Sequence, residues 1–424
     1  MEPTIIVEKE MIFTEQQIKE AVDKYPTPFH MYHGDLIQSN AQSMLNSFRK
    51  HFSDYTNYYA VKAAPNPYLM KLLKDCGMGV DCSSMAELLL SEKVGFKNNE
   101  IMFTSNNTPA EEYIKAYELG AVINLDDITQ IDYLRESLGG KMPDLISFRY
   151  NPGPLKKGNA IIGEPQEAKF GLTGNDLPLA YAKAKEYGVK RFGLHCMVAS
   201  NELDVHYFEE TAKLLFSTVA QLSDQLGIEF EMVNLGGGVG IPYRPGQNRI
   251  DYDRLTSLIH KAYTEMIINK GLKPLKVVTE CGRVITGPYG VLVTKALHSK
   301  STYKEYIGVD ACMANLMRPG MYGSYHHITV VSPQDPGQTQ KYDIVGSLCE
   351  NNDKFAIDRV LPKISRGDIL VIHDTGAHGH SMGFNYNGKL RSAEYVYHQQ
   401  SATPFKCIRR AETYQDLFST LLDI

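Results

Sequence analysis

Residues 58–94 read YYAVKAAPNPYLMKLLKDCGMGVDCSSMAELLLSEKV, and this stretch sets the architecture of the chain. Two short apolar runs, 58–61 and 79–82, are each followed by a segment with helical periodicity, 68–76 and 85–94. Short strands that alternate with helices are typical of a parallel sheet, because a parallel strand needs a crossover connection to return. The stretch therefore predicts two consecutive strand-helix units.

The same alternation continues to residue 280. Six further apolar runs are predicted as strands, at 101–104, 122–125, 145–150, 192–198, 230–235 and 277–280. Helical periodicity lies between several of them, at 110–119, 177–187, 207–226 and 252–269. Eight parallel strands can close a sheet on itself, so we predict an α/β fold with a (β/α)8 TIM-type barrel over residues 28–283.

The pattern changes after Arg283. Five β-forming runs follow without long helices between them, at 289–294, 306–309, 327–331, 342–345 and 369–373. We therefore predict a second, C-terminal domain, a mostly antiparallel β-barrel formed by residues 284–424. Residues 1–27 are too few to fold alone, and we expect them to pack on this domain.

Length, charge and cysteine pattern restrict the class of protein. A chain of 424 residues exceeds what one core usually serves, which agrees with two domains. The net charge of -5 and the lack of a long basic run argue against a nucleic-acid partner, and no apolar stretch approaches the roughly 20 residues that span a bilayer. No signal-like pattern begins the sequence, and the seven cysteines form no Cys-x-x-Cys pair. We expect a cytoplasmic protein with reduced cysteines and a small-molecule substrate.

In a barrel of this kind, the reacting groups gather at the C-terminal ends of the strands. The predicted strand ends carry a lysine, acids, arginines, a histidine and a glycine-rich loop. These residues are Lys62, Asp81, Arg149, His195, Ser200, Gly236, Gly237, Gly238, Glu280 and Arg283. We therefore expect these side chains to point into one opening, at the C-terminal end of the barrel.

Each of these signals has a plainer alternative. Lys62 follows an apolar strand, which would partly desolvate its amine and lower its pKa as a Schiff-base lysine requires, but a lysine also caps strand ends in solvent. The glycine run at 236–238 suits a phosphate cradle, but such turns also serve as simple connectors. Glu280 could hold a proton on a heteroaromatic nitrogen or pair with a nearby arginine. Only the combination indicates a cofactor site.

Seven ordered motifs carry a resemblance to a known family. They are Ala60-Val61-Lys62-Ala63, Lys169-Phe170-Gly171, Gly236-Gly237-Gly238, Glu280-Cys281-Gly282-Arg283, Arg318-Pro319-x-x-Tyr322-Gly323, Cys349-Glu350 and Asn385-Tyr386-Asn387. From about residue 28 to 400 the chain resembles the alanine-racemase-fold (fold-type III) decarboxylases that depend on pyridoxal 5'-phosphate, among them diaminopimelate, ornithine and arginine decarboxylases.

The resemblance implies a set of cofactor contacts. Lys62 would form the Schiff base with pyridoxal 5'-phosphate, and Glu280 would bond the pyridine nitrogen. The other implied cofactor residues are Asp81, Arg149, His195, Met197, Ser200, Gly236, Gly237, Gly238 and Tyr386. The family acts as a homodimer whose sites are shared across the interface, so Cys349 would come from the partner chain and protonate the carbanion after decarboxylation.

The chain is most similar to the diaminopimelate decarboxylases of this family, in 318–323 and in Cys349-Glu350-x-x-Asp353. The implied reaction is decarboxylation of meso-2,6-diaminopimelate to L-lysine and CO2. Its implied substrate-binding residues are Arg283, Arg318, Tyr322, Glu350 and Tyr386, with the arginines on the distal carboxylate and Glu350 on the distal ammonium. Ornithine and lysine lack that carboxylate and would leave arginines unpaired.

Two positions depart from the family pattern. Met197 stands where the family usually has a histidine that stacks on the cofactor ring, and a thioether is a softer, uncharged packing partner. Cys281 replaces a proline between Glu280 and Gly282. The first departure keeps open a related decarboxylase that acts on another basic amino acid, a D-amino acid or a carboxylated polyamine.

The sequence offers two further alternatives. A non-catalytic regulatory paralogue is disfavoured, because a binding module has no need of Lys62, Glu280, Cys349 and the glycine loop together. Histidines at 373, 378 and 380 with Asp374 could form a metal site. The same stretch leads into the Tyr386 motif, however, and we expect no metal.

Overall fold

The computed structural model describes residues 9–158, 163–335 and 337–422. The chain divides into two compact units. The barrel unit comprises residues 38–241 and 249–285, and the β-rich unit comprises the chain up to residue 37, residues 242–248 and the chain from 286 onward. Residues 28–37 and 242–248, which we predicted to belong to the barrel, therefore lie in the β-rich unit.

The barrel unit contains a closed barrel of parallel strands, as predicted. In chain order the strands are β2 (Thr56–Ala60), β3 (Gly79–Cys82), β4 (Ile101–Thr104), β5 (Val122–Leu125), β6 (Leu145–Arg149), β7 (Arg191–His195), β8 (Phe230–Asn234) and β9 (Lys276–Thr279). Pairing of β9 with β2, in the register Thr56 to Val278, closes the barrel.

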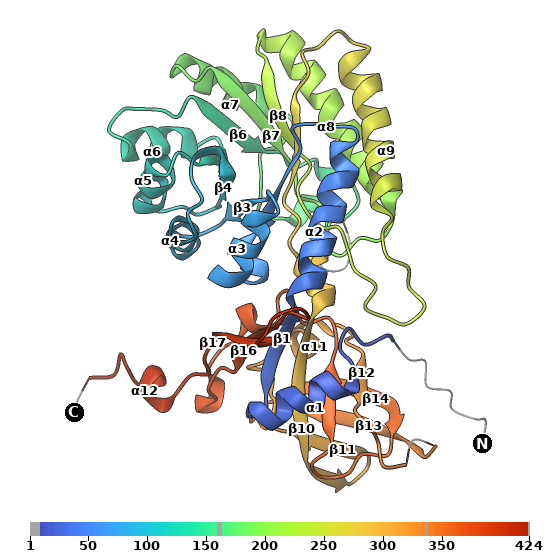
Figure 1. Cartoon of the computed structure of the whole chain (residues 1–424). Helices are drawn as coiled ribbons and strands as arrows, with labels where there is room; N and C mark the ends of the chain where they lie inside the picture. The colour runs from blue at the N-terminus through green and yellow to red at the C-terminus, as the bar shows by residue number, and fades with distance from the viewer. Residues whose placement is uncertain (1–8, 159–162, 336, 423–424) are drawn as a thin grey trace. The chain divides into compact units, whose positions relative to one another are not determined.

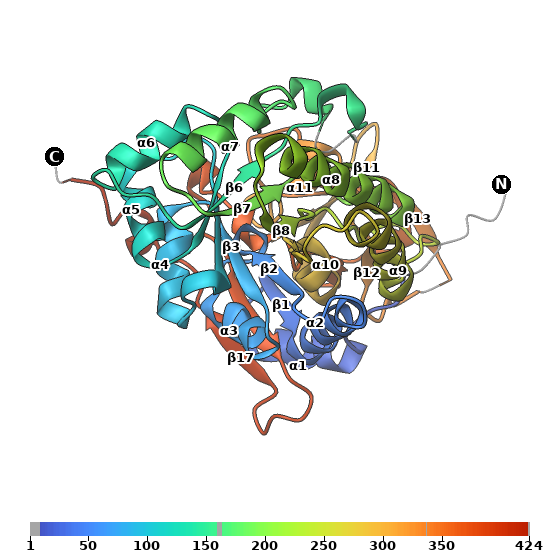
Figure 2. The ribbon, with the colours of Figure 1, turned by 90° about the horizontal axis from the view of Figure 1, so that it is seen from above.

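Helices surround these strands (Figure 2). They are α2 (Gly34–Arg49), α3 (Pro67–Asp75), α4 (Met85–Val94), α5 (Ala110–Glu118), α6 (Gln130–Ser137), α7 (Asp176–Glu186), α8 (Val205–Leu226) and α9 (Tyr252–Tyr263). Helices α2 and α6 were not predicted, and the predicted helix at 252–269 is α9 followed by a π turn over 264–268.

Local sequence signals explain where the helices begin and end. Asn66 caps α3 by accepting the N–H of Tyr68, and Asp204 caps α8 by accepting the N–H of His206. Gly95 and Gly227 end α4 and α8 in the left-handed region, at φ values of 91° and 59°, where glycine meets no steric penalty. These caps keep each crossover short.

The β-rich unit contains one mostly antiparallel sheet of nine strands. They are β1 (Phe29–His33), β10 (Gly290–Ser301), β11 (Glu305–Val309), β12 (Ile328–Val330), β13 (Thr339–Val345), β14 (Lys354–Pro362), β15 (Ile369–Ile372), β16 (Ala393–Tyr397) and β17 (Phe405–Arg409). The main path runs β14-β13-β11-β10-β1-β16-β17, and β15 pairs with both β10 and β12.

The N-terminal segment belongs to this sheet. Strand β1 pairs antiparallel with β10 and parallel with β16, and Figure 1 shows blue β1 and α1 (Glu15–Lys24) among orange and red strands. This pairing is the reason that residues 28–37 fall outside the barrel unit. Phe13, Ile18 and Ala21 pack with buried residues of β1 and β10 in one apolar cluster.

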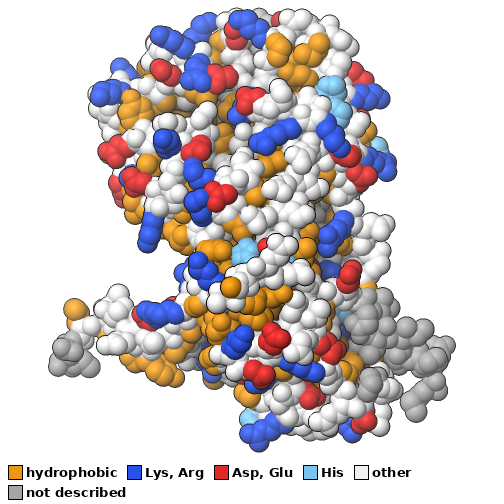
Figure 3. All heavy atoms as spheres, in the orientation of Figure 1, with side chains coloured by type: hydrophobic (Ala, Val, Ile, Leu, Met, Phe, Trp, Pro, Cys, Tyr) orange, Lys and Arg blue, Asp and Glu red, His pale blue; other side chains and the backbone are white. Residues whose placement is uncertain are grey.

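Two surface features agree with the charge analysis. Within the described residues, none of the helices combines the length and apolarity needed to span a bilayer. On the face of the barrel seen in Figure 3, Lys and Arg side chains are interspersed with Asp and Glu.

The sheet core generates a test of stability. Leu292 on β10 is fully buried, whereas Leu179 on α7 is 59% exposed. We expect Leu292→Ala to lower the free energy of unfolding by about 2–5 kcal/mol, because it leaves a cavity, and the matched Leu179→Ala to change it by less than about 0.5 kcal/mol. Urea unfolding of both variants measures this, and equal effects would contradict the core assignment.

Candidate active site

The C-terminal ends of the barrel strands bring together the predicted strand-end residues. Asp81 lies on β3, Arg149 ends β6 and His195 ends β7. Lys62 follows β2 in a short 3-10 turn, Val61–Ala63. Residues 236–238 follow β8, and Glu280 directly follows β9.

Glu280 is a buried carboxylate held by three side chains. Its Oε2 lies 3.0 Å from Nε2 of His195. Its Oε1 accepts hydrogen bonds from Nδ2 of Asn234, at 2.8 Å, and from the hydroxyl of Thr104, at 3.3 Å. Burial alone would raise the pKa of Glu280, but His195, the Lys62 amine and Asn234 stabilise the anion and lower that pKa. Glu280 is therefore an anion at neutral pH.

His195 is itself oriented by a buried amide. Nδ2 of Asn124, on β5, donates to Nδ1 of His195 at 3.0 Å. The other ring nitrogen, Nε2, faces Oε2 of Glu280. The sequence motifs do not single out Asn124, Asn234 and Thr104 as site residues. The available signal was a polar residue at or near the end of an otherwise apolar strand.

Asp81 behaves in the opposite way to Glu280. It is buried, and its Oδ1 has no hydrogen-bond partner. Burial and the nearby Glu280 carboxylate raise its pKa well above the usual range, although the Lys62 amine opposes this shift. The barrel mouth therefore holds one acid that is charged and one that favours its protonated form.

Lys62 lies within electrostatic range of these two acids, since its amine lowers the pKa of both. We expected the amine to be partly desolvated. The structure corrects this expectation, because the Lys62 side chain is exposed. Lys62 lies in the 3-10 turn that follows β2, between the buried residues Val61 and Ala63.

Each of the three glycines in the loop lies against the backbone of a neighbouring strand end or loop on the side where a side chain would stand. A Cβ on Gly236 would lie 2.2 Å from the carbonyl oxygen of Cys196, and one on Gly237 would lie 2.6 Å from that of Glu280. A Cβ on Gly238 would lie 2.5 Å from the carbonyl oxygen of Ala199. The loop can carry no side chain, so its peptide groups form an open cradle of the kind that suits a phosphate.

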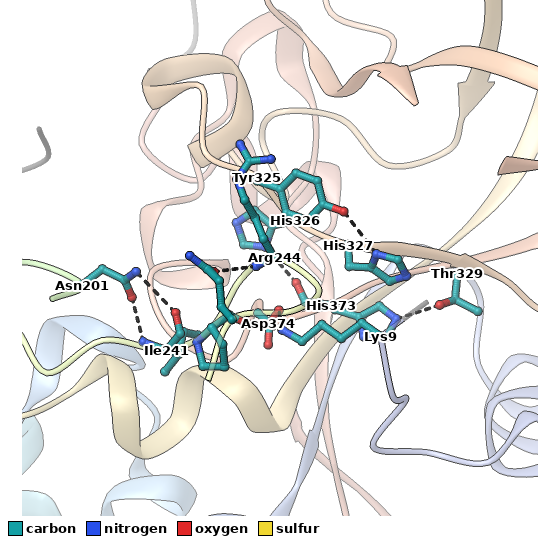
Figure 4. A network of polar contacts seen from close by, with 12 residues as sticks. Lys9, Asn201, Ile241, Arg244, Tyr325, His326, His327, Thr329, His373 and Asp374 are labelled. Atoms are coloured by element: carbon teal, nitrogen blue, oxygen red, sulfur yellow. Dashed lines mark hydrogen bonds and ion pairs between the residues drawn. The ribbon is translucent and has the colours of Figure 1, made fainter. Parts of the chain in front are cut away.

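The neighbouring loop after β7 is joined to the glycine loop. Oδ1 of Asn201 accepts the N–H of Ile241 at 2.9 Å (Figure 4). The N–H of Glu202 donates to the carbonyl oxygen of Gly238 at 2.9 Å. Ser200, next to this pairing, accepts a hydrogen bond from Nη2 of the buried Arg283 at 3.5 Å. These contacts hold Ser200 and Arg283 beside the cradle.

Met197 makes an unexpected contact. Its Sδ accepts the N–H of Gly237 at 3.2 Å, so the thioether reaches the glycine loop. Its carbonyl oxygen accepts from Nη2 of Arg149 at 3.4 Å. The Arg149 guanidinium also lies over the ring of Phe170, 4.3 Å from its centre, and 3.9 Å from Oδ1 of Asp126.

The remaining predicted site residues lie in the β-rich unit. Arg318 is buried at the start of α11 (Arg318–Tyr322), and Tyr322 at its end is exposed. Three residues past Tyr322, the Tyr325 hydroxyl bonds Nδ1 of His327 at 3.2 Å (Figure 4).

Three more of these residues are exposed in the β-rich unit. They are Cys349 and Glu350, in the connection from β13 to β14, and Tyr386, in the short turn η8 (Tyr386–Gly388). The structure thus groups the predicted site residues into two sets, one in each unit.

The barrel set fits pyridoxal phosphate. The cradle at 236–238 is closed to side chains, a charged buried carboxylate suits a ring nitrogen that carries a proton, and an exposed amine is free to meet an aldehyde. A parallel α/β barrel with these groups at its C-terminal mouth is the layout of a cofactor-dependent enzyme.

Comparison with known proteins agrees. Residues 38–287 match the family described as "Pyridoxal-dependent decarboxylase, pyridoxal binding domain". The chain belongs to this family of pyridoxal-phosphate-dependent decarboxylases, and its cofactor is pyridoxal phosphate.

Individual relatives are similar over nearly the whole chain. Protein TabA of Pseudomonas amygdali pv. tabaci is 39% identical over 94% of this chain and 92% of its own length. The diaminopimelate decarboxylase of Methanothermobacter thermautotrophicus is 33% identical over the same shares of the two chains. The crystal structure of the Methanocaldococcus jannaschii diaminopimelate decarboxylase with L-lysine has 30% identity, a TM-score of 0.89, and coverage of 96% of this chain and 94% of that one. The predicted fold class is thereby confirmed.

The glycine cradle generates a test of cofactor binding. In Gly237→Ala the new methyl group would meet the Glu280 carbonyl, so we expect pyridoxal phosphate affinity to fall at least about ten-fold, a loss of about 1.4 kcal/mol. In the control Gly308→Ala, the nearest atom would lie at an ordinary 3.7 Å, and affinity should not change. Absorbance titration with the cofactor measures both. Unchanged affinity in Gly237→Ala would contradict a phosphate cradle here.

Asp81 generates a pH-dependent test. Its folded pKa is raised, so the cofactor-free protein loses stability as pH rises from the ordinary value of 3.8 through the folded pKa. We expect Asp81→Asn to raise the melting temperature of the cofactor-free protein, and to do so more at pH 8 than at pH 5. Asp132, an acid on α6 whose pKa is lowered by hydrogen bonds from Lys183 and Tyr187, serves as control. Asp132→Asn should not stabilise at either pH.

Proposed function

We propose that this protein decarboxylates meso-2,6-diaminopimelate to L-lysine and CO2. The observation that carries the proposal is the buried, anionic Glu280 beside a side-chain-free glycine cradle, in a barrel of the pyridoxal-dependent decarboxylase family. Similarity to diaminopimelate decarboxylases over nearly the full chain supports this substrate.

The barrel residues would bind and orient the cofactor. When bound, pyridoxal phosphate supplies a ring that accepts the electron pair left by departing CO2. Glu280 has both oxygens engaged, yet a carboxylate accepts up to about four hydrogen bonds, so it can also hold a proton on the ring nitrogen. The Lys62 amine would bond the aldehyde carbon. Gly236, Gly237, Gly238, Ser200 and Tyr386 would hold the phosphate, with Asp81, Arg149, His195 and Met197 near the ring.

Substrate recognition would use charge. Diaminopimelate has a distal carboxylate and a distal ammonium, so Arg283, Arg318 and Tyr322 would bind the first and Glu350 the second. Tyr386 would lie close to both substrate and phosphate. Ornithine or lysine would leave the arginines without an anion in a closed site, which costs affinity.

Cys349 would supply the final proton. Its thiol is exposed, which suits a group that must re-equilibrate with solvent after each turnover. We propose that the enzyme is a homodimer in which Cys349 and Glu350 serve the partner's barrel.

A second candidate keeps the reaction and changes the substrate to another basic amino acid, a D-amino acid or a carboxylated polyamine. Met197, which stands in place of a ring-stacking histidine and bonds the glycine loop, favours it. The 39% identity to Protein TabA adds a relative whose name states no substrate.

One assay tests the proposal. Purified protein with pyridoxal phosphate and meso-diaminopimelate should release equal amounts of CO2 and L-lysine, and Lys62→Ala should lower the rate at least about 1,000-fold, because the covalent step is lost. Lys71→Ala, at an exposed lysine on α3, is the matched control and should keep full activity.

A substrate panel separates the two candidates. Faster decarboxylation of lysine, ornithine or a D-amino acid than of diaminopimelate would favour the second. No product with any of these compounds above the Lys62→Ala background would end both.

A further inference from the structure

A hydrogen bond joins two loops of the β-rich unit. The backbone N–H of Cys349 donates to Oδ1 of Asn387 at 2.7 Å. Asn387 directly follows Tyr386, the proposed phosphate and substrate contact. The backbone of Cys349, the proposed proton donor, is therefore bound to the loop that carries Tyr386.

The residues beside Cys349 are held by a different group. Asp353 is buried, and its carboxylate accepts the N–H of Leu348 at 2.8 Å and the N–H of Met313 at 2.6 Å. Its own N–H donates to the carbonyl oxygen of Glu350 at 3.0 Å. Asp353 thus fixes the chain on both sides of Cys349, and Asn387 fixes the amide of Cys349 itself.

The Asn387 loop has a defined shape of its own. Asn387 has a φ of 54°, in the left-handed region that asparagine tolerates better than most residues. Nδ2 of Asn385 donates to the carbonyl oxygen of Lys389 at 3.0 Å and to Oε2 of Glu412 at 2.7 Å. The same Oε2 accepts the N–H of Arg391 at 2.9 Å. These hydrogen bonds hold the Asn387 loop independently of its contact with Cys349.

We propose that Asn387 is a positioning residue that holds the Cys349 amide and thereby directs the thiol proton to the substrate carbon. The inference rests on the proposed role of Cys349 and deepens it. Because Asn387 adjoins Tyr386, the bond also joins the loop of the acid, which would serve the partner's barrel, to the loop of the proposed phosphate contact in the same chain.

The fate of one proton makes this testable. When bound, the cofactor would share the electron pair left by departing CO2, so that either the substrate's α carbon or the cofactor's C4' carbon would accept a proton. A proton from the Cys349 thiol to the α carbon breaks the S–H bond and gives the amine product, and solvent re-protonates the thiolate. A solvent proton to C4' instead, followed by hydrolysis of the C=N bond with one water, gives pyridoxamine phosphate and an aldehyde.

The experiment uses three variants of the holoenzyme. Asn387→Gly keeps the backbone conformation and removes the acceptor, whereas Asn387→Asp keeps an acceptor oxygen. Asn98→Gly is the matched control, since Asn98 has a φ of 55° in the barrel unit. Two quantities are measured: the hydrogen–deuterium exchange rate of the Cys349 amide, and the fraction of turnovers that yield pyridoxamine phosphate.

We expect Asn387→Gly to exchange the Cys349 amide roughly five-fold faster, as loss of one net hydrogen bond implies. Its pyridoxamine phosphate fraction should rise several-fold, toward that of Cys349→Ala. Asn387→Asp and Asn98→Gly should match the wild-type protein in both measurements.

Three outcomes would overturn the inference. Unchanged exchange in Asn387→Gly means that the bond does not hold the amide. Faster exchange with an unchanged product fraction, while Cys349→Ala raises it, means that Asn387 does not direct the proton, although the proposed function stands. No effect of Cys349→Ala on the fraction would remove the proton-donor role itself.

Discussion

The barrel mouth depends on the stabilisation of one buried anion. Glu280 sits at the end of the last barrel strand, where burial alone would neutralise it, and His195 and Asn234 from two other strands keep it charged. Removing one partner of such a buried pair typically costs about 3–5 kcal/mol. Parallel pairing of β7, β8 and β9 brings these strand ends together, so the chemistry of the site follows from the fold.

The second constraint is close packing of backbone. The glycine loop after β8 lies against the loops after β7 and β9 so tightly that a methyl group at Gly236, Gly237 or Gly238 would collide with a carbonyl oxygen. Paired contacts of Asn201 and Glu202 hold the β7 loop to it. A buried anionic side chain and a side-chain-free cradle in the same barrel mouth are what a phosphorylated cofactor with a basic ring nitrogen requires.

The predictions failed where non-local pairing decided the result. Strand β1 was assigned to the barrel region, but it pairs with β10 and β16, which are far away in sequence. Strand β14 was missed because its apolar alternation is broken by exposed and half-exposed residues and by bulges. Lys62 was expected to be partly buried, yet it is exposed, in the 3-10 turn that follows β2.

The sequence by itself determined the eight barrel strands and the strand-end residues, because a period of short apolar runs and helices is a local property. It also carried the family motifs. Only the tertiary structure decided which side chains support the predicted site residues. Asn124 orients His195, Thr104 and Asn234 hold Glu280, and Asn387 binds Cys349. These partners are distant in sequence and have no local pattern, so folding alone brings them within hydrogen-bond distance.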